Sequence, residues 1–170
     1  RVPVLETDFA SAQMIKYASN AFLAARISFI NEIAEICEKT GADIKKVVQG
    51  MGHDARIGHA YLEAGLGFGG PCLEKDLRAL ITIAEGKGHE PQLLKTVLER
   101  NERQVEQVII KLKCLIGHLL YGKTLAVFGL AFKAGTNDVR NSLALKVIKR
   151  LEEEGAIIRA HDPVAISHAK

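Results

Sequence analysis

The spacing of apolar residues changes near residue 121, and this change limits the folds open to the chain. Before it, apolar residues recur at helical spacing in stretches that start near Thr7 or Asp8, Asp43, Pro71 and Pro91. After it, apolar runs over 124–128 and 156–160 read as buried strands on either side of a helical pattern over 142–154. Strand, helix and strand in this order form a βαβ unit. We therefore predict a mainly α protein, with a helical domain over 1–121 followed by the opening βαβ of a Rossmann-like α/β domain over 122–170.

The longest helical pattern covers residues 8–39 and ends at Gly41. Its middle is apolar nearly all round, which predicts burial between other helices or at a subunit interface. Pro71 is expected at the first position of the third helix, because proline is favoured there. The fourth helix is expected to run from Pro91 to about Leu119.

The composition is that of an ordinary globular protein, with 48% apolar and 25% charged residues and a formal net charge of +3. So small a net charge gives no reason to expect binding to nucleic acid or to a membrane. The three cysteines form no CxxC pair and the six histidines show no metal-ligand spacing, so we predict neither a disulfide framework nor a metal site. This cysteine content fits a reducing, cytoplasmic setting.

The two ends of the sequence indicate a piece of a longer protein. It starts with Arg-Val-Pro-Val and stops soon after the second predicted strand. We expect the protein to continue beyond both ends of this sequence.

The passage Gly-Leu-Gly-Phe-Gly-Gly-Pro-Cys-Leu-Glu-Lys-Asp, residues 65–76, is the most unusual in the chain. Its glycines let a ligand approach the backbone closely, and the passage leads into a helix. Cys72, expected near the second helical position, would lie in the partial positive charge of the helix start, which favours the nucleophilic thiolate. Asp76, four residues later on the same face, could reach water or substrate beside the sulfur. The alternative is that Cys72 is a small buried apolar residue and the glycines only make a tight turn.

Lys16 and Asn20 lie four residues apart, on one face of a helix that is otherwise largely apolar. An ammonium and a carboxamide side by side can hold an oxygen as it gains negative charge, and a buried lysine can also move a proton. The alternative is that Lys16 extends into solvent and Asn20 bonds to a loop carbonyl.

These motifs resemble, in the same order, those of the nucleotide-sugar 6-dehydrogenases. The resemblance extends to Arg56-Ile-Gly, to Phe-Gly-Leu-Ala-Phe-Lys over 128–133 and to Asp138-Val-Arg140. In that family an amino-terminal Rossmann domain binds NAD, a helical central domain forms the dimer core and a carboxy-terminal α/β domain holds the nucleotide. No GxGxxG follows a strand here, so the resemblance places the NAD domain before Arg1 and implies that this piece alone is inactive.

The resemblance also implies roles for individual residues, with UDP-glucose as the favoured substrate. Cys72 would trap the C6 aldehyde as a thiohemiacetal and then carry a thioester, while Asp76 would position or deprotonate water. Lys16 and Asn20 would stabilise the oxyanion. The implied substrate contacts are Lys16, Asn20, Arg56, Glu63, Gly65, Gly67, Phe68, Gly69, Phe132 and Lys133, and the implied NAD contacts are Cys72, Lys75 and Arg140. Arg56 would reach the active site of a neighbouring subunit, in a homodimer built on the helix over 8–39.

The chain departs from the family pattern at a few positions. The family more usually has Pro at Leu66, Ser at Pro71 and Phe-Pro at Leu73-Glu74. The charge of Glu74 would oppose thiolate formation to some extent. The Lys75-Asp76 pair resembles the UDP-glucose and GDP-mannose branches more than the N-acetylmannosamine branch.

Two other functions stay open at this point. One is the helical domain of a β-hydroxyacid-type dehydrogenase, in which a Lys-xxx-Asn pair also occurs but no cysteine is needed. The other is a non-catalytic dimerisation scaffold in which Cys72 is inert.

Overall fold

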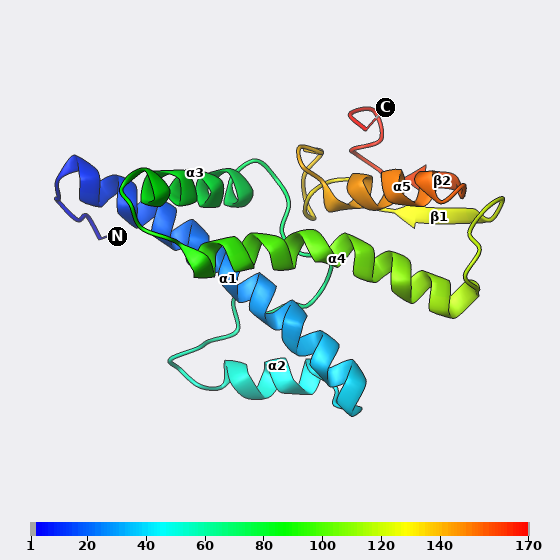
Figure 1. The fold of residues 1–170 in the computed structure, drawn as a ribbon, viewed down its shortest axis with the longest axis horizontal. Coiled ribbons are helices and arrows are strands. Elements are labelled where there is room, and N and C mark those ends of the chain that lie inside the picture. Colours follow the sequence, from blue (N-terminus) through cyan, green and yellow to red (C-terminus); the bar gives the residue numbers. More distant parts are fainter. Residues whose placement is uncertain (1–2, 170) are drawn as a thin grey trace.

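The structure, a computed structural model, describes residues 3–169, which form five α-helices and a two-stranded parallel sheet (Figure 1). The elements are α1 (Phe9–Thr40), α2 (Ile44–Gly52), α3 (Leu73–Gly86), α4 (Gln92–Ile116), β1 (Thr124–Phe128), α5 (Leu143–Glu153) and β2 (Ile157–His161). The predicted fold class, mainly α with an opening βαβ unit, is confirmed. The division at 121/122 stays a prediction. Arg1, on which part of the expectation of a longer chain was based, lies outside the described residues.

The ends of α1 follow from local capping. The Asp8 carboxylate accepts a hydrogen bond from the Ser11 backbone N–H at 2.9 Å, and Gly41 ends the helix with a φ of 76°. The predicted helix over 8–39 is thereby confirmed. The helix crosses α4 in Figure 1, and its amino-terminal end and the βαβ unit lie at opposite ends of the molecule.

The middle of α1 is buried on more than one side, because Ile30 (0% exposed) lies opposite Ala21 on the helix and is buried as well. Ala21, Ala24, Ser28 and Asn31 recur at helical spacing and are at most 5% exposed. On another face a row of large apolar side chains is between 49% and 63% exposed, namely Ile15, Phe22, Phe29 and Ile36. Of the two expected placements, burial between other helices does not hold for this exposed face within residues 3–169, and burial at a subunit interface stays a prediction.

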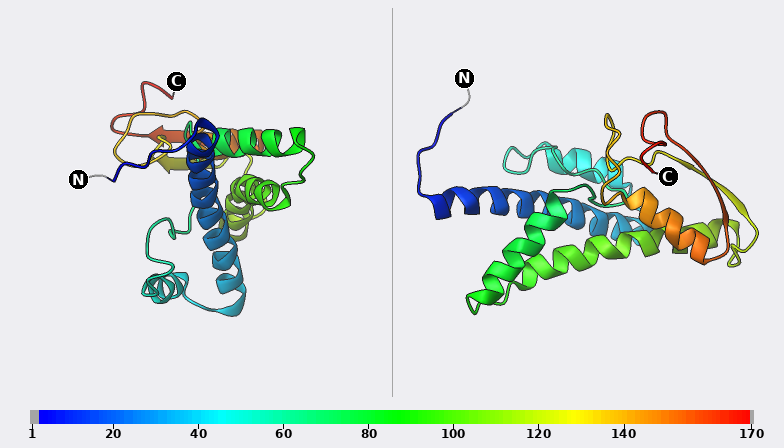
Figure 2. Two further views of the ribbon diagram at one scale, coloured as in Figure 1. Left: turned by 90° about the vertical axis from the view of Figure 1, so that its left-hand side faces the viewer. Right: turned by 90° about the horizontal axis from the view of Figure 1, so that it is seen from above.

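The long helix α4 belongs to two hydrophobic clusters. Its first half packs with α1 and α3 around Ala24, Leu77 and Val97. Its second half packs with α5 and the sheet through Val105 and Ile109. Figure 2 shows α4 running from beside α3 to beneath α5. Because one rigid helix carries both clusters, it fixes where the βαβ unit lies relative to α1 and α3.

Strands β1 and β2 pair in parallel from Thr124 opposite Ile157 to Phe128 opposite His161, so their carboxyl ends meet at one edge. Asp162, which follows β2, joins the two strand ends at this edge. One of its carboxylate oxygens accepts the N–H groups of Leu130 (2.8 Å) and Ala131 (3.3 Å). The other accepts the N–H groups of Val164 (2.9 Å) and Ala165 (2.7 Å).

Two expected boundaries differ from the structure. Helix α3 begins at Leu73 with Cys72 as its N-cap, so Pro71 lies before the helix. Helix α4 ends at Ile116 rather than near Leu119, because Gly117 takes a φ of 102°. Among residues 3–169, no helix combines the length and apolar character needed to cross a membrane.

We predict that Asp162→Asn lowers the melting temperature by several degrees at neutral pH. The four backbone N–H bonds hold the pKa of Asp162 well below its ordinary value of 3.8, so the ionised side chain stabilises the fold. That contribution is complete above pH 3.8 and disappears as the pH falls toward the lowered pKa. Thermal unfolding of both proteins from pH 7 to pH 3 checks this: the difference should shrink below about pH 4. A difference that stays constant with pH contradicts it.

Candidate active site

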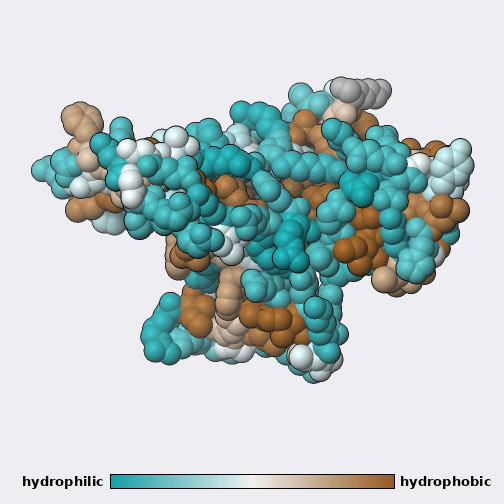
Figure 3. Space-filling model, viewed as in Figure 1, coloured by the Kyte–Doolittle hydropathy of each residue, from teal (hydrophilic) through white to brown (hydrophobic). Residues whose placement is uncertain are grey.

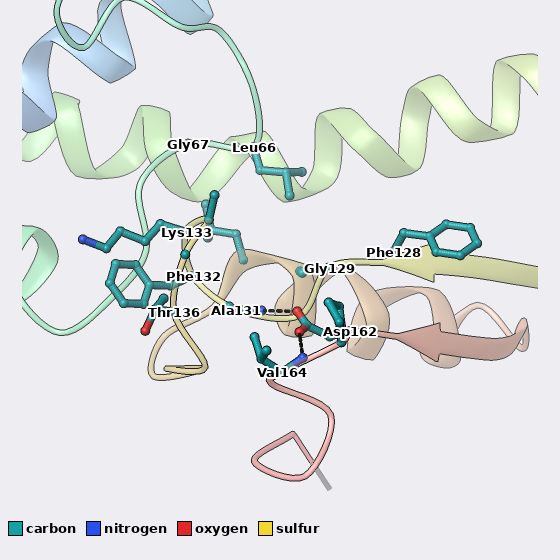
Figure 4. A pocket seen from close by; sticks show the side chains of 15 residues that line it. Leu66, Gly67, Phe128, Gly129, Ala131, Phe132, Lys133, Thr136, Asp162 and Val164 are labelled. Atoms are coloured by element: carbon teal, nitrogen blue, oxygen red, sulfur yellow. Dashed lines mark hydrogen bonds between the residues drawn. The ribbon is translucent and has the colours of Figure 1, made fainter.

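Two cavities adjoin where the helical part meets the βαβ unit. The first, about 420 Å³, is lined by α1, the glycine-rich loop (residues 65–72), the start of α3 and the loop after β1. The second, about 440 Å³, lies at the carboxyl ends of β1 and β2 (Figure 4). Gly67, Phe132 and Lys133 line both. A ligand with two parts could therefore occupy both cavities at once.

The thiol of Cys72 faces the first cavity. Cys72 is exposed and unbonded to another cysteine, and Asn20 lines the same cavity. Two cations lie near the sulfur. The pKa of Lys75 is raised, chiefly by Asp76 and to a lesser extent by Cys72, and the pKa of Arg140 is raised chiefly by Asp138 and also by Cys72. The position of Cys72 differs from the expectation. It occupies the N-cap position of α3, without a side-chain capping hydrogen bond, instead of lying within the first turn.

Asp76 is the buried centre of the polar cluster beside Cys72. Its side chain is 1% exposed and accepts a hydrogen bond from Asn20 Nδ2 at 2.6 Å. Lys75 Nζ lies 2.9 Å from one carboxylate oxygen, and Lys16 Nζ lies 3.8 Å from the other. The contact with Lys75 lowers the pKa of Asp76, and Asn20 and Lys16 lower it further, although burial acts in the opposite direction. The carboxylate is therefore ionised at neutral pH and is a weak base.

Lys16 and Asn20, which the spacing predicted to lie side by side, both contact the Asp76 carboxylate, a contact that the spacing did not predict. The Lys16 side chain is 65% exposed, so the burial that would help it move a proton is absent. Asn20 does not bond to a loop carbonyl; Asp76 orients its amide instead. Asn20 lines the cavity and can offer an N–H donor to an oxygen there, whereas Lys16 is not part of the cavity lining and contributes its positive charge from beside the Asp76 carboxylate.

The second cavity lies where ligands bind in α/β folds, at the carboxyl ends of parallel strands. Figure 4 shows Leu66 and Gly67 on one side of it and the loop bearing Phe132 and Lys133 across from them. Asp162 holds the start of that loop through Leu130 and Ala131.

Gly70 allows the glycine-rich loop to touch the βαβ unit. It has a φ of 80°, and a Cβ there would lie 2.5 Å from the ring of Phe132. A larger residue would have to push this ring, and with it the wall shared by both cavities, out of place.

Arg56 and Glu63 do not line either of these cavities as residues 3–169 form them. Arg56 is 89% exposed on the loop after α2 and bonds to Asp54. Arg26 anchors this loop by donating to the carbonyls of Ile57 (2.8 Å) and Gly58 (3.0 Å). Gly65 is likewise absent from both linings, whereas Phe68 and Gly69 line the first cavity.

Glu74 is held on the side of α3 that faces the βαβ unit. Its carboxylate accepts from Asn141 at 2.5 Å and from Arg78 at 2.9 Å. Burial acts to raise the pKa of Glu74, but Asn141, Arg78 and Lys146 outweigh it and the pKa is lowered. The charge that we expected to oppose the thiolate is thus balanced by two neighbouring cations.

Three buried amide side chains were not identified as site residues from the sequence. Asn31, Asn101 and Gln104 all bond to the backbone of the glycine-rich loop. The sequence held a signal for one of them, because Asn101 is a polar residue on the apolar stripe of α4, between Val97 and Val105. Within residues 3–169, no group of three or more His, Cys, Asp or Glu side chains is arranged to hold a metal ion.

Comparisons with known proteins agree with this arrangement of two parts. The family model for the central domain of the UDP-glucose/GDP-mannose dehydrogenase family matches residues 10–103. The model for the UDP binding domain of the same family matches residues 126–170.

Similar proteins and solved structures cover nearly the whole chain. UDP-glucose 6-dehydrogenase TuaD of Bacillus subtilis is 51% identical over 98% of this chain, and AglM of Haloferax volcanii, also a UDP-glucose 6-dehydrogenase, is 45% identical over 99%. A UDP-glucose dehydrogenase structure from Pyrobaculum islandicum superimposes on 99% of the chain with a TM-score of 0.96 and 41% identity. This chain spans only 36% and 39% of the two curated relatives and 39% of the solved chain. The chain belongs to the UDP-glucose/GDP-mannose dehydrogenase family.

Proposed function

We propose that this chain is the central domain and the start of the carboxy-terminal domain of an NAD-dependent dehydrogenase that oxidises the C6 hydroxyl of a nucleotide sugar, UDP-glucose, to the carboxylate. The division at 121/122 separates these two domains in the proposal. The observation that carries it is the exposed Cys72 in a cavity that is also lined by Asn20, the hydrogen-bond partner of the buried Asp76. Activity belongs to the complete protein, of which this piece supplies the covalent site.

The covalent chemistry takes place at Cys72. Oxidation of the C6 alcohol gives an aldehyde, and the Cys72 thiolate adds to its carbon to form a thiohemiacetal. Loss of a second hydride gives a thioester. Water then attacks the thioester, which releases the carboxylate and restores the thiol. NAD, when bound, supplies the hydride acceptor for each of the two oxidations.

The polar cluster acts on the oxygen of this intermediate. Lys16 and Asn20 stabilise the oxyanion that forms when the thiolate adds and again when water attacks. Asp76 positions them, because it is ionised, buried and bonded to Asn20. The two roles implied for Asp76 were to position water or to deprotonate it, and its lowered pKa favours positioning water over removing its proton.

The residues of this chain fit a minor part of an NAD site. No glycine-rich dinucleotide fingerprint follows a strand, so the main contacts belong to another domain. Lys75 and Arg140 pair with Asp76 and Asp138, and their side chains are 65% and 70% exposed. These exposed cations can meet the negative charge of the cofactor next to the reacting sulfur.

The two cavities suit the two parts of the substrate. The nucleotide would lie at the carboxyl ends of β1 and β2, and the hexose would lie beside Cys72. Phe132 and Lys133 line both cavities, and Lys133 can meet the diphosphate between them.

The exposed apolar row of α1 supports a homodimer through the helix over 8–39. Ile15, Phe22, Phe29 and Ile36 follow one another at intervals of seven residues, the spacing of a helix-packing seam. In Figure 3 apolar side chains reach the surface over α1 and α2, in the lower part of the molecule. The exposed Arg56 loop lies near this region and would enter the partner's active site. The three free cysteines support a cytoplasmic setting.

The two other functions are less well supported. A β-hydroxyacid-type dehydrogenase needs no cysteine in the cavity, yet Cys72 lies there beside two cations. A dimerisation scaffold with an inert Cys72 requires no oriented amide or ionised carboxylate next to the sulfur.

We predict that Cys72→Ser in the complete enzyme lowers net formation of the acid by about a thousandfold or more, because serine forms no thioester. The measurement is NADH formed per UDP-glucose consumed, which should be two in the wild type. Cys114→Ser, which removes the other exposed free thiol, is the control and should keep wild-type activity. One NADH per sugar, or full activity of Cys72→Ser, contradicts the proposal.

We predict that two inactive enzymes regain activity when mixed. A Cys72→Ser subunit still offers Arg56 to its neighbour, so a mixed dimer with an Arg56→Ala subunit contains one complete site. Refolding equal amounts together should restore about a quarter of wild-type activity, because half the dimers are mixed and each has one working site. No recovery in dimers shown to be mixed contradicts the assignment of Arg56 to the neighbouring site.

We predict that Phe22→Asp weakens the dimer, raising its dissociation constant by about thirtyfold or more through a charge in the apolar seam. Sedimentation velocity over a range of concentrations measures this. Leu93→Asp is the matched control, since Leu93 is a 71% exposed apolar residue on α4. If both variants associate like the wild type, the seam is not the interface.

A further inference from the structure

The backbone of the glycine-rich loop is held by an amide clamp, which consists of Asn31 on α1 and Asn101 and Gln104 on α4. The Gly65 N–H donates to Asn31 Oδ1 at 2.8 Å, and Gln104 Nε2 donates to the Gly65 carbonyl at 2.6 Å. The Asn101 side chain bonds to both backbone polar groups of Phe68. It accepts from the N–H at 2.7 Å and donates to the carbonyl at 2.9 Å.

The clamp is buried although it holds a surface loop. Asn31 is 1%, Asn101 is 3% and Gln104 is 8% exposed. Water competes poorly for hydrogen bonds at such positions, and breaking one leaves a buried polar group without a partner. The loop conformation is therefore fixed more strictly than a glycine-rich sequence alone would allow.

Asn101 is the central member, because it uses both ends of its amide while Asn31 and Gln104 each bond to the loop through one. Its approach depends on Gly67, where a Cβ would lie 2.3 Å from Asn101 Oδ1. Gly67 also has a φ of 102°, which other residues rarely adopt. Asn101 and Gly67 thus fit one another as a pair.

The loop segment held by the amide clamp forms part of the walls of both cavities. Gly67 lines both cavities, and Phe68 and Gly69 line the one that contains Cys72. Holding this wall before the substrate arrives reduces the entropy lost on binding. The clamp touches neither Cys72 nor the Asn20–Asp76 pair, so it can affect binding without taking part in the chemistry.

We propose that Asn101, supported by Asn31 and Gln104, is a positioning residue that holds the glycine-rich loop in the conformation that binds the nucleotide sugar. The proposal rests on the proposed function for the identity of the ligand. It predicts that loss of the clamp acts mainly on KM, and that it frees the loop even when no substrate is present.

The test compares Asn101→Ala with Ser28→Ala in the complete enzyme. Ser28 is a matched control, because its buried hydroxyl donates to the Val97 carbonyl at 2.9 Å and so joins the same two helices without touching the loop. In Asn101→Ala we expect KM for UDP-glucose to rise about tenfold, with kcat changed less than about threefold. Hydrogen exchange of a peptide spanning residues 65–70 should become faster without substrate. Ser28→Ala should change neither quantity.

Two results overturn the proposal. One is loop exchange in Asn101→Ala that matches the wild type. The other is a KM change that is the same in both variants, which would reduce Asn101 to a structural role. A complete wild-type enzyme that oxidises no nucleotide sugar refutes the proposed function instead. The exchange comparison uses no substrate and still decides whether the clamp orders the loop.

Discussion

The continuity of α4 through two hydrophobic clusters is the constraint on which the rest of the structure depends. The helix packs against α1 and α3 at one end and against α5 and the sheet at the other. Asn101 and Gln104 lie between these two contacts and hold the loop that separates the cavities. The helix α4 therefore both bonds to the glycine-rich loop and positions the βαβ unit.

The polar cluster at Cys72 shows how one buried carboxylate can organise a site. Asp76 is nearly inaccessible, yet it is the common partner of Asn20, Lys16 and Lys75. An ionised carboxylate is expensive to bury unless it is well paired, and one hydrogen bond from Asn20 together with two neighbouring ammonium groups offsets that cost. The bond to Asn20 also orients an amide that lines the cavity of Cys72.

Much of the fold could be predicted from the sequence, because periodicity and caps are local signals. Asp8, Gly41 and the strand-helix-strand pattern gave element types and, for α1, the ends. The start of α3 was misjudged because proline is favoured at a first helical position but is also common just before one. The exposed row on α1 could not be separated from a buried one, since sequence spacing does not say which face the chain itself covers.

The site was predicted less completely, because its parts meet through tertiary contacts. Spacing placed Lys16 beside Asn20, but their meeting with Asp76 and the amide clamp both join residues 33 or more positions apart, which no local pattern predicts. The central claim is that Cys72 carries the half-oxidised sugar as a covalent intermediate. Mass spectrometry of the complete enzyme, quenched in acid during turnover of UDP-glucose, tests it most directly. The account predicts a hexose-derived adduct on the Cys72 peptide and none on the Cys114 peptide. Product accumulation with Cys72 unmodified at every time point would contradict it.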